Sequence, residues 1–168
     1  MNPVPNPPEP PPVPRRVVLL PKRVAGVAFL ALFPLLALTG VLANRVTSTT
    51  VEAGSLTVEM EYPSRLRYRT EQPLDVEVRN RGTEPARSAR VSVNREFLSG
   101  FADAAYTPEP SRVTEEAVEF DLGIIPAGAV RRVQIELKAE RYGLQRGQVR
   151  VEAGDASADL EIRTFVLP

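Results

Sequence analysis

The sequence predicts an all-β domain, a sandwich of antiparallel strands, preceded by a single transmembrane α-helix. Two observations predict this architecture. Residues 24–43 form an apolar run of 20 residues without a charged side chain. From residue 56 onward, apolar and polar residues alternate in seven short segments. An uncharged run of that length matches the hydrocarbon core of a bilayer, and alternation with a period of two is typical of strands with one buried face.

The residues before the apolar run indicate its orientation. Residues 1–14 contain eight prolines, so residues 1–23 are expected to be a disordered tail with a basic flank. One basic residue, Arg45, follows the run before Arg65. Basic residues near a membrane span favour the cytoplasmic side, which predicts a cytoplasmic N-terminus and an extracytoplasmic C-terminal domain. The bases before the run are Arg15, Arg16, Lys22 and Arg23.

A cleaved signal peptide is the alternative to a retained anchor. Val41 and Ala43 are small residues at the two positions that a signal peptidase inspects. The apolar run is longer than the usual signal-peptide core of about 7–15 residues, and its preceding polar segment is also long. These lengths favour a retained anchor, and a secreted domain released by signal peptidase remains the competing interpretation.

Composition narrows the possible chemistry. The chain contains no Cys, His or Trp and has a formal net charge of zero. Thiol nucleophiles, histidine bases and the usual zinc and copper ligands are therefore excluded, and we expect neither a cofactor nor a metal. Zero net charge argues against nucleic-acid binding. Without disulfides, the exported part must fold on its hydrophobic core.

The segment 44–54 is short, polar and rich in Thr and Ser, and it is predicted to be a linker. Eleven residues reach at most about 37 Å when extended, so the domain that follows should lie near the membrane. That domain covers residues 55–168. Its seven predicted strands are residues 56–62, 74–79, 89–94, 118–122, 132–138, 148–152 and 159–163.

Turn-forming residues separate these strands, for example Asn80-Arg81-Gly82 and Pro126-Ala127-Gly128. No segment after residue 55 shows the 3.6-residue period of an amphipathic helix. Seven short antiparallel strands in about 115 residues are typical of an immunoglobulin-like β-sandwich. The Cys and Trp residues of antibody domains are absent, so the likeness concerns architecture.

Two stretches carry a resemblance to a known class of module. Residues 74–93 read LDVEVRNRGTEPARSARVSV, a strand, an Asn-x-Gly turn and a second strand. Residues 120–143 read FDLGIIPAGAVRRVQIELKAERYG, in which a Pro-x-Gly turn precedes a long alternating strand. Together they resemble bacterial extracytoplasmic Ig-like modules of the adhesion-related and conserved-repeat kinds, over about residues 50–168. The resemblance implies a binding or spacer module and no catalytic residues.

The segment from Phe97 to Ser111 is the longest part of the domain without alternation. Long loops on a sandwich commonly carry recognition, and exposed aromatic side chains would anchor a protein partner. The alternative is that these side chains close the open end of the core. The candidate partner-binding residues are Phe97, Leu98, Phe101 and Tyr106.

The sequence therefore predicts a non-catalytic interaction or accessory module of a membrane or cell-envelope assembly, with a protein partner and an integral membrane anchor. A carboxylate-based cell-wall enzyme is the remaining alternative, because Glu115-Glu116 forms a pair of acids. The pair comes without a recognisable third catalytic group, which argues against catalysis. Arg65, Arg67 and Arg69 recur on one face of an extended segment. They would either hold a polyanion or a lipid headgroup, or pair with acids on neighbouring strands.

Overall fold

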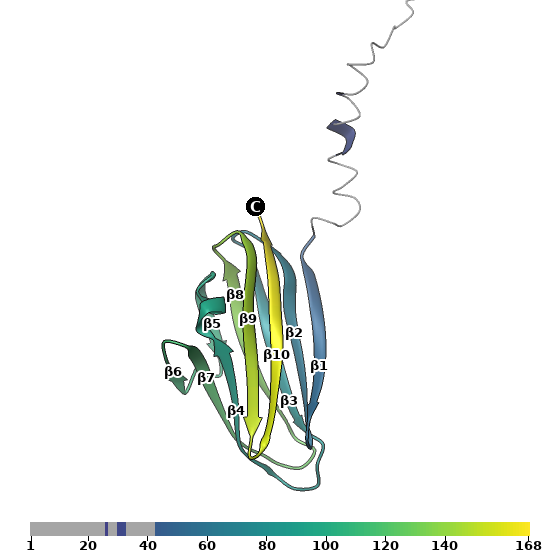
Figure 1. The fold of residues 1–168 in the computed structure, drawn as a ribbon, viewed down its shortest axis with the longest axis vertical. Helices are drawn as coiled ribbons and strands as arrows, with labels where there is room; N and C mark the ends of the chain where they lie inside the picture. Colours follow the sequence, from purple (N-terminus) through teal and green to yellow (C-terminus); the bar gives the residue numbers. More distant parts are fainter. Residues whose placement is uncertain (1–25, 27–29, 33–42) are drawn as a thin grey trace, which may run out of the picture. The chain divides into compact units, whose positions relative to one another are not determined.

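The computed structural model of the chain describes residue 26, residues 30–32 and residues 43–168 (Figure 1). The predicted tail, residues 1–23, and most of the predicted transmembrane segment, residues 24–43, lie outside this part. Among the described residues, no helix is both long and apolar enough to cross a bilayer.

Residues 43–168 form an all-β domain, which confirms the predicted class. Each of the seven predicted strands is present, and three more strands and one short helix accompany them. In chain order the elements are β1 (Arg45–Ala53), β2 (Leu56–Arg67), β3 (Glu71–Asn80), β4 (Ala86–Asn94), α2 (Arg95–Leu98), β5 (Phe101–Thr107), β6 (Arg112–Val113), β7 (Ala117–Ile125), β8 (Val130–Ala139), β9 (Gly143–Ala153) and β10 (Ala156–Leu167).

The strands join into one mixed sheet with the order β5-β8-β3-β2-β10-β9-β4-β7-β6, and β1 pairs with β2. The sheet curls so that its two halves face each other (Figure 1). The ring of Tyr106 on β5 lies 5.9 Å from the ring of Phe120 on β7, although these strands are far apart in the sheet order. The prediction of a wholly antiparallel sheet is wrong at one place, because Phe165–Leu167 of β10 pair in parallel with Arg65–Arg67 of β2.

The core lies between the two halves. Alternate residues point inward from every long strand, so that Met60, Val76, Val133 and Ile162 are fully buried while their neighbours along the chain face solvent or are half-buried. Burying an aliphatic side chain of this size contributes roughly 1.5–3 kcal/mol. The alternation seen in the sequence is thus the inward and outward pattern of the folded sheet.

The predicted linker, residues 44–54, is wrong for nearly all of its length, because residues 45–53 form β1. This strand pairs with β2 from Arg45 opposite Arg65 to Ala53 opposite Leu56, and Gly54 turns the chain between them at a φ of 60°. Threonine and valine fit a pleated, half-buried surface well. Hydrogen bonding to the edge of β2 gives this polar segment a place in the sheet.

Candidate functional site

The segment predicted to be an exposed recognition loop is α2 followed by β5. Phe97, Leu98 and Phe101 are 1%, 6% and 7% exposed, and Tyr106 is half-buried with a phenol pKa raised by burial. The rings of Phe97 and Phe101 lie 4.9 Å apart. The expectation of exposed anchors is therefore wrong for Phe97, Leu98 and Phe101, which close one part of the core. Partner binding through this segment stays a prediction.

Two local features hold Phe97 in place. The side-chain oxygen of Asn94 accepts a hydrogen bond from the backbone N–H of Phe97 at 3.0 Å, which caps α2. Gly147 on β9 presents only a hydrogen atom toward the ring, since a Cβ there would lie 2.4 Å from the Cβ of Phe97. The close approach of α2 to β9 thus depends on a glycine 50 residues further along the chain.

A carboxylate cluster, defined as Glu59, Glu61, Asp75 and Glu77, lies on the outer face of β2 and β3. The register places Glu59 opposite Glu77 and Glu61 opposite Asp75. Like charges directly opposite each other destabilise a sheet. Together with Arg132 of β8, the cluster lines a hollow of about 110 Å³.

Arginine side chains neutralise part of this cluster. The carboxylate of Glu77 accepts hydrogen bonds from Arg132 at 3.0 Å and Arg79 at 3.3 Å. The bond from Arg132 is the main reason that the pKa of Glu77 lies below its usual value. In contrast, Oδ1 of Asp75 is buried and has no hydrogen-bond partner within the described part of the chain. Within that same part, no group of three acidic, histidine or cysteine side chains could hold a metal ion.

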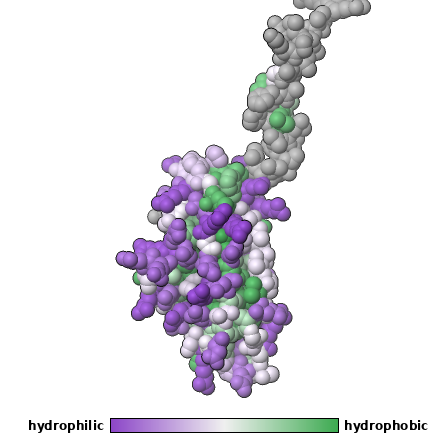
Figure 2. All heavy atoms as spheres, viewed as in Figure 1, coloured by the Kyte–Doolittle hydropathy of each residue, from purple (hydrophilic) through white to green (hydrophobic). Residues whose placement is uncertain are grey.

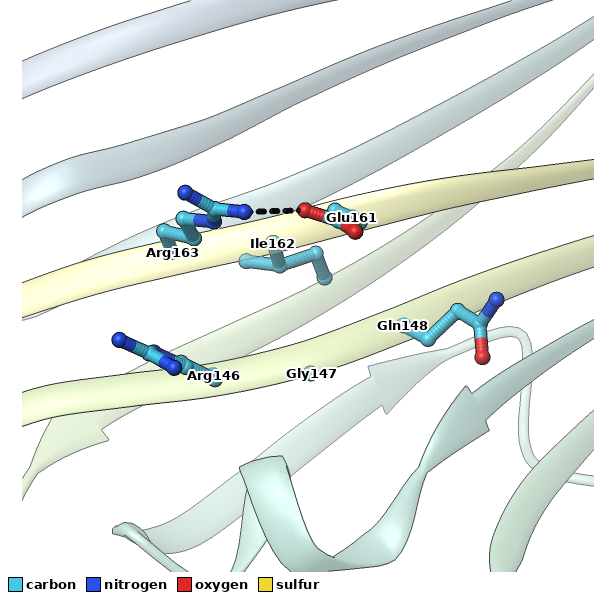
Figure 3. Close-up of a pocket in the computed structure, with 6 residues that line it drawn as sticks. All are labelled: Arg146, Gly147, Gln148, Glu161, Ile162 and Arg163. Atoms are coloured by element: carbon cyan, nitrogen blue, oxygen red, sulfur yellow. Dashed lines mark hydrogen bonds and ion pairs between the residues drawn. The ribbon is translucent and has the colours of Figure 1, made fainter.

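A second hollow, of about 300 Å³, lies over β9 and β10 (Figure 3). Figure 3 shows Arg146 and Arg163 side by side at one end of it, with Gln148 and Glu161 at the other. Arg163 and Glu161 form an ion pair of 2.6 Å. The floor of this hollow is the backbone of Gly147 and Ile162, because the Ile162 side chain is fully buried and a Cβ on Gly147 would point toward Phe97 on the inner face. Such a surface can accept polar or charged groups and offers no enclosed chamber for a reaction.

One end of the sandwich is strongly basic. We call it the basic end and define it as residues 44–47, 63–71, 138–146 and 163–168. These segments contain eight Arg and Lys residues and two Asp and Glu residues, whereas the rest of residues 43–168 contains nine bases and 18 acids. Figure 2 shows that hydrophilic residues cover most of the visible face of the domain, with small hydrophobic areas between them.

The basic end is held together by contacts among all four segments. Arg45 pairs with Arg65 across β1 and β2, and β10 runs beside β2 to Leu167. The backbone N–H of Arg69 donates to the carbonyl of Ala139 at 2.9 Å, and the N–H of Tyr68 donates to the carbonyl of Leu167 at 2.8 Å. The start of β1 and the end of β10 therefore lie at the same end of the domain (Figure 1).

Comparisons with known proteins found remote likenesses. No protein-family model matches the sequence, and no curated protein matches it either. Among solved structures, the chain is similar to a CARDB domain of Pyrococcus furiosus, solved with two metal ions, at 15% identity and a TM-score of 0.45, covering 72% of this chain and 95% of that domain.

Two further structures are similar over smaller parts of larger chains. A family 123 glycoside hydrolase of Clostridium perfringens has 14% identity and a TM-score of 0.41 over 61% of this chain and 22% of the enzyme. A DNA-bound alkylpurine DNA glycosylase of Pseudomonas fluorescens has 16% identity and a TM-score of 0.34 over 86% of this chain and 38% of the glycosylase. At these identities and scores, none of the three structures indicates a function for this chain.

Proposed function

We propose that the chain is a single-pass membrane protein with a cytoplasmic N-terminus and an Ig-like, extracytoplasmic, non-catalytic accessory domain that serves a membrane or cell-envelope assembly. The observation that carries the proposal is the join between residues 43 and 45. The uncharged run of 20 residues ends at Ala43, and the first strand of the sandwich begins at Arg45. A sandwich joined to a membrane span in this way stays at the bilayer surface.

The charged side chains of the domain support binding in preference to catalysis. A carboxyl group that acts as a general acid needs a raised pKa, whereas the pKa of Glu77 in the carboxylate cluster is lowered. On the outer face of β9 and β10, Asp159 pairs with Arg150 at 2.7 Å. These groups present fixed charges on open strand faces, which suits recognition of a complementary surface.

Membrane fractionation and a topology reporter test the anchor. We expect the full chain to remain in membranes after an alkaline wash, and we expect a reporter that is active only outside the cytoplasm to be active when fused after Pro168. A soluble chain whose intact mass begins at Asn44 would instead support the secreted alternative. An inactive reporter on a stable fusion would refute the proposed orientation.

Photo-crosslinking in intact membranes tests the accessory role. A photoreactive residue is placed at exposed Glu61, next to the carboxylate cluster, or at exposed Gln148, beside the hollow of β9 and β10. We expect a discrete protein adduct from one face and a much weaker adduct from the other. Adducts of the same pattern and strength from both faces, or from neither, would refute the proposal of a specific protein partner.

A further inference from the structure

The charges of the domain are segregated along its long axis. The basic end carries an excess of six positive charges, and the remainder of residues 43–168 carries an excess of nine negative charges. This separation is invisible in the net charge of the whole chain, which is zero. The first residue after the apolar run, Asn44, belongs to the basic end, so the chain itself attaches the membrane span to the positive side of the domain.

An ordered aromatic pair lies within the basic end. The rings of Tyr68 and Tyr142 are 4.5 Å apart, and the guanidinium carbon of Arg69 lies 5.4 Å from the centre of the Tyr68 ring. Arg69 adopts a φ of 60°, in the left-handed region that residues with a side chain rarely adopt. A hydrogen bond from the backbone N–H of Arg69 to the carbonyl of Ala139 holds the backbone in this conformation. The turn places the Arg69 guanidinium over the Tyr68 ring.

Two exposed apolar side chains also belong to the basic end. Leu144 and Phe165 are direct cross-strand neighbours on the outer face of β9 and β10, and they are 47% and 46% exposed. A hollow of about 420 Å³ beside the start of β1 is lined by Ala43, Asn44, Arg67 and Thr70. Positive charge, tyrosine rings and exposed apolar groups are thus all present at the basic end.

We propose that the basic end docks on the anionic phospholipid headgroups of the bilayer that anchors the chain. This inference rests on the proposed function, because the anchor must be retained. Arginine guanidinium groups match phosphate oxygens in two-pronged hydrogen bonds, and tyrosine concentrates at the level of the headgroups. The acidic remainder of the domain is repelled by the same surface, so the charge separation fixes which way the domain stands.

Distance favours a lipid surface over a soluble polyanion as the occupant. The chain from Ala43 to Arg45 spans two residues and extends at most about 7 Å. The length over which salt screens charges at physiological ionic strength is about 8 Å. The start of β1 is therefore held within reach of the electrostatic potential of an anionic bilayer. The local concentration of headgroups at the basic end is permanently high, and weak contacts to several phosphates are sufficient for docking.

A fluorescence experiment on the full chain tests the proposal. Because the sequence contains no cysteine, Pro168→Cys introduces a unique labelling site at the basic end, and Ala127→Cys introduces one in the exposed turn before β8. The labelled proteins are reconstituted in nanodiscs of phosphatidylcholine alone or of phosphatidylcholine with phosphatidylglycerol. Lipids with a quencher on the headgroup then report which end of the domain touches the surface.

We expect phosphatidylglycerol to increase quenching at residue 168 and to leave residue 127 unchanged. Substituting Arg69→Gln and Arg141→Gln should lower the ratio of docked to undocked protein about fivefold per charge, the equivalent of about 1 kcal/mol each. The matched control removes the same two charges from the opposite end through Arg87→Gln and Arg131→Gln, and it should retain docking. Raised ionic strength should release residue 168.

Each outcome separates the two proposals. If the chain does not co-purify with nanodiscs, the anchor is absent and the proposed function fails together with the docking. If it co-purifies but quenching at residue 168 is the same in neutral and anionic nanodiscs, the anchor stands and docking on anionic lipid is refuted. Equal losses from the Arg69 and Arg141 pair and from its control would also refute it, because total charge would then decide the result.

Discussion

Replacing Asn80 by alanine should remove the buried polar contact that ties the loop after β3 to the end of β7. Asn80 is fully buried. Its side-chain amide donates to the carbonyl of Glu84 at 2.7 Å and to that of Ile125 at 3.0 Å, and its oxygen accepts from the backbone N–H of Gly82 at 2.9 Å. One side chain therefore satisfies three backbone groups.

The magnitude follows from these three bonds. A neutral hydrogen bond contributes about 1 kcal/mol net, and a buried partner left unsatisfied raises the loss. We expect Asn80→Ala to lower the free energy of unfolding by about 3 kcal/mol. For a domain of this size that loss corresponds to a decrease in Tm of about 10 °C. Since small domains are stable by about 5–15 kcal/mol, the variant should still fold.

Urea unfolding of residues 43–168, followed by far-UV circular dichroism, measures this loss. Asn94→Ala is the matched control, because it removes the single capping bond to Phe97 and should lower stability by only about 1 kcal/mol. Asn80→Asp keeps the acceptor for Gly82 but turns a carboxylate toward two carbonyl oxygens, so at neutral pH it should be at least as destabilising as alanine. If Asn80→Ala loses no more stability than Asn94→Ala, the hydrogen-bond argument is wrong.

Three further predictions use the same unfolding measurement. Phe97→Ala should lower stability by about 3–5 kcal/mol because the ring is almost fully buried, and a near-neutral result would contradict its place in the core. Gly147→Ala should lower stability by about 1–3 kcal/mol because the new Cβ meets the Cβ of Phe97 at 2.4 Å; an unchanged urea midpoint would show that α2 yields freely. The lowered pKa of Glu77, caused first by the hydrogen bond from Arg132, means that its carboxylate stabilises the fold above the ordinary carboxyl pKa and loses this effect as the pH falls through its folded pKa. Glu77→Gln should therefore lower stability by about 0.5–1 kcal/mol at neutral pH and have less effect in acid, and an equal effect at both pH values would contradict this.

Alternation predicted the strands whose two faces differ in polarity. In β3, for example, Leu74, Val76 and Val78 are buried and the residues between them are charged. Two missed strands lack this contrast. The β1 segment consists largely of Thr, Ser and Val, and β5 carries alanine at three of its seven positions. Their strand conformation comes from pairing with β2 and β8, which a local pattern does not contain.

The candidate site was less predictable because its surroundings come from distant parts of the chain. The aromatic residues after β4 lie in a segment without alternation, which favours an exposed recognition loop. The structure leaves room for Phe97 because β9 carries a glycine at residue 147. Likewise, the basic end combines segments separated by more than 100 residues. The recurring arginines 65, 67 and 69 are visible in the sequence, whereas the contact of Tyr142 with Tyr68 is not.

The carboxylate cluster shows what strand register adds to the sequence pattern. Either strand alone presents acids on its solvent face, which is ordinary. The register places those acids directly opposite one another, an arrangement that costs about 0.2–1 kcal/mol per pair, although shifting one strand by two residues would preserve the buried face. In this register Leu56 lies opposite Asn80, whose side chain donates a hydrogen bond to the carbonyl of Ile125. The acids of this cluster lie outside the basic end, so they contribute to the charge polarity on which the proposed orientation of the domain at a membrane depends.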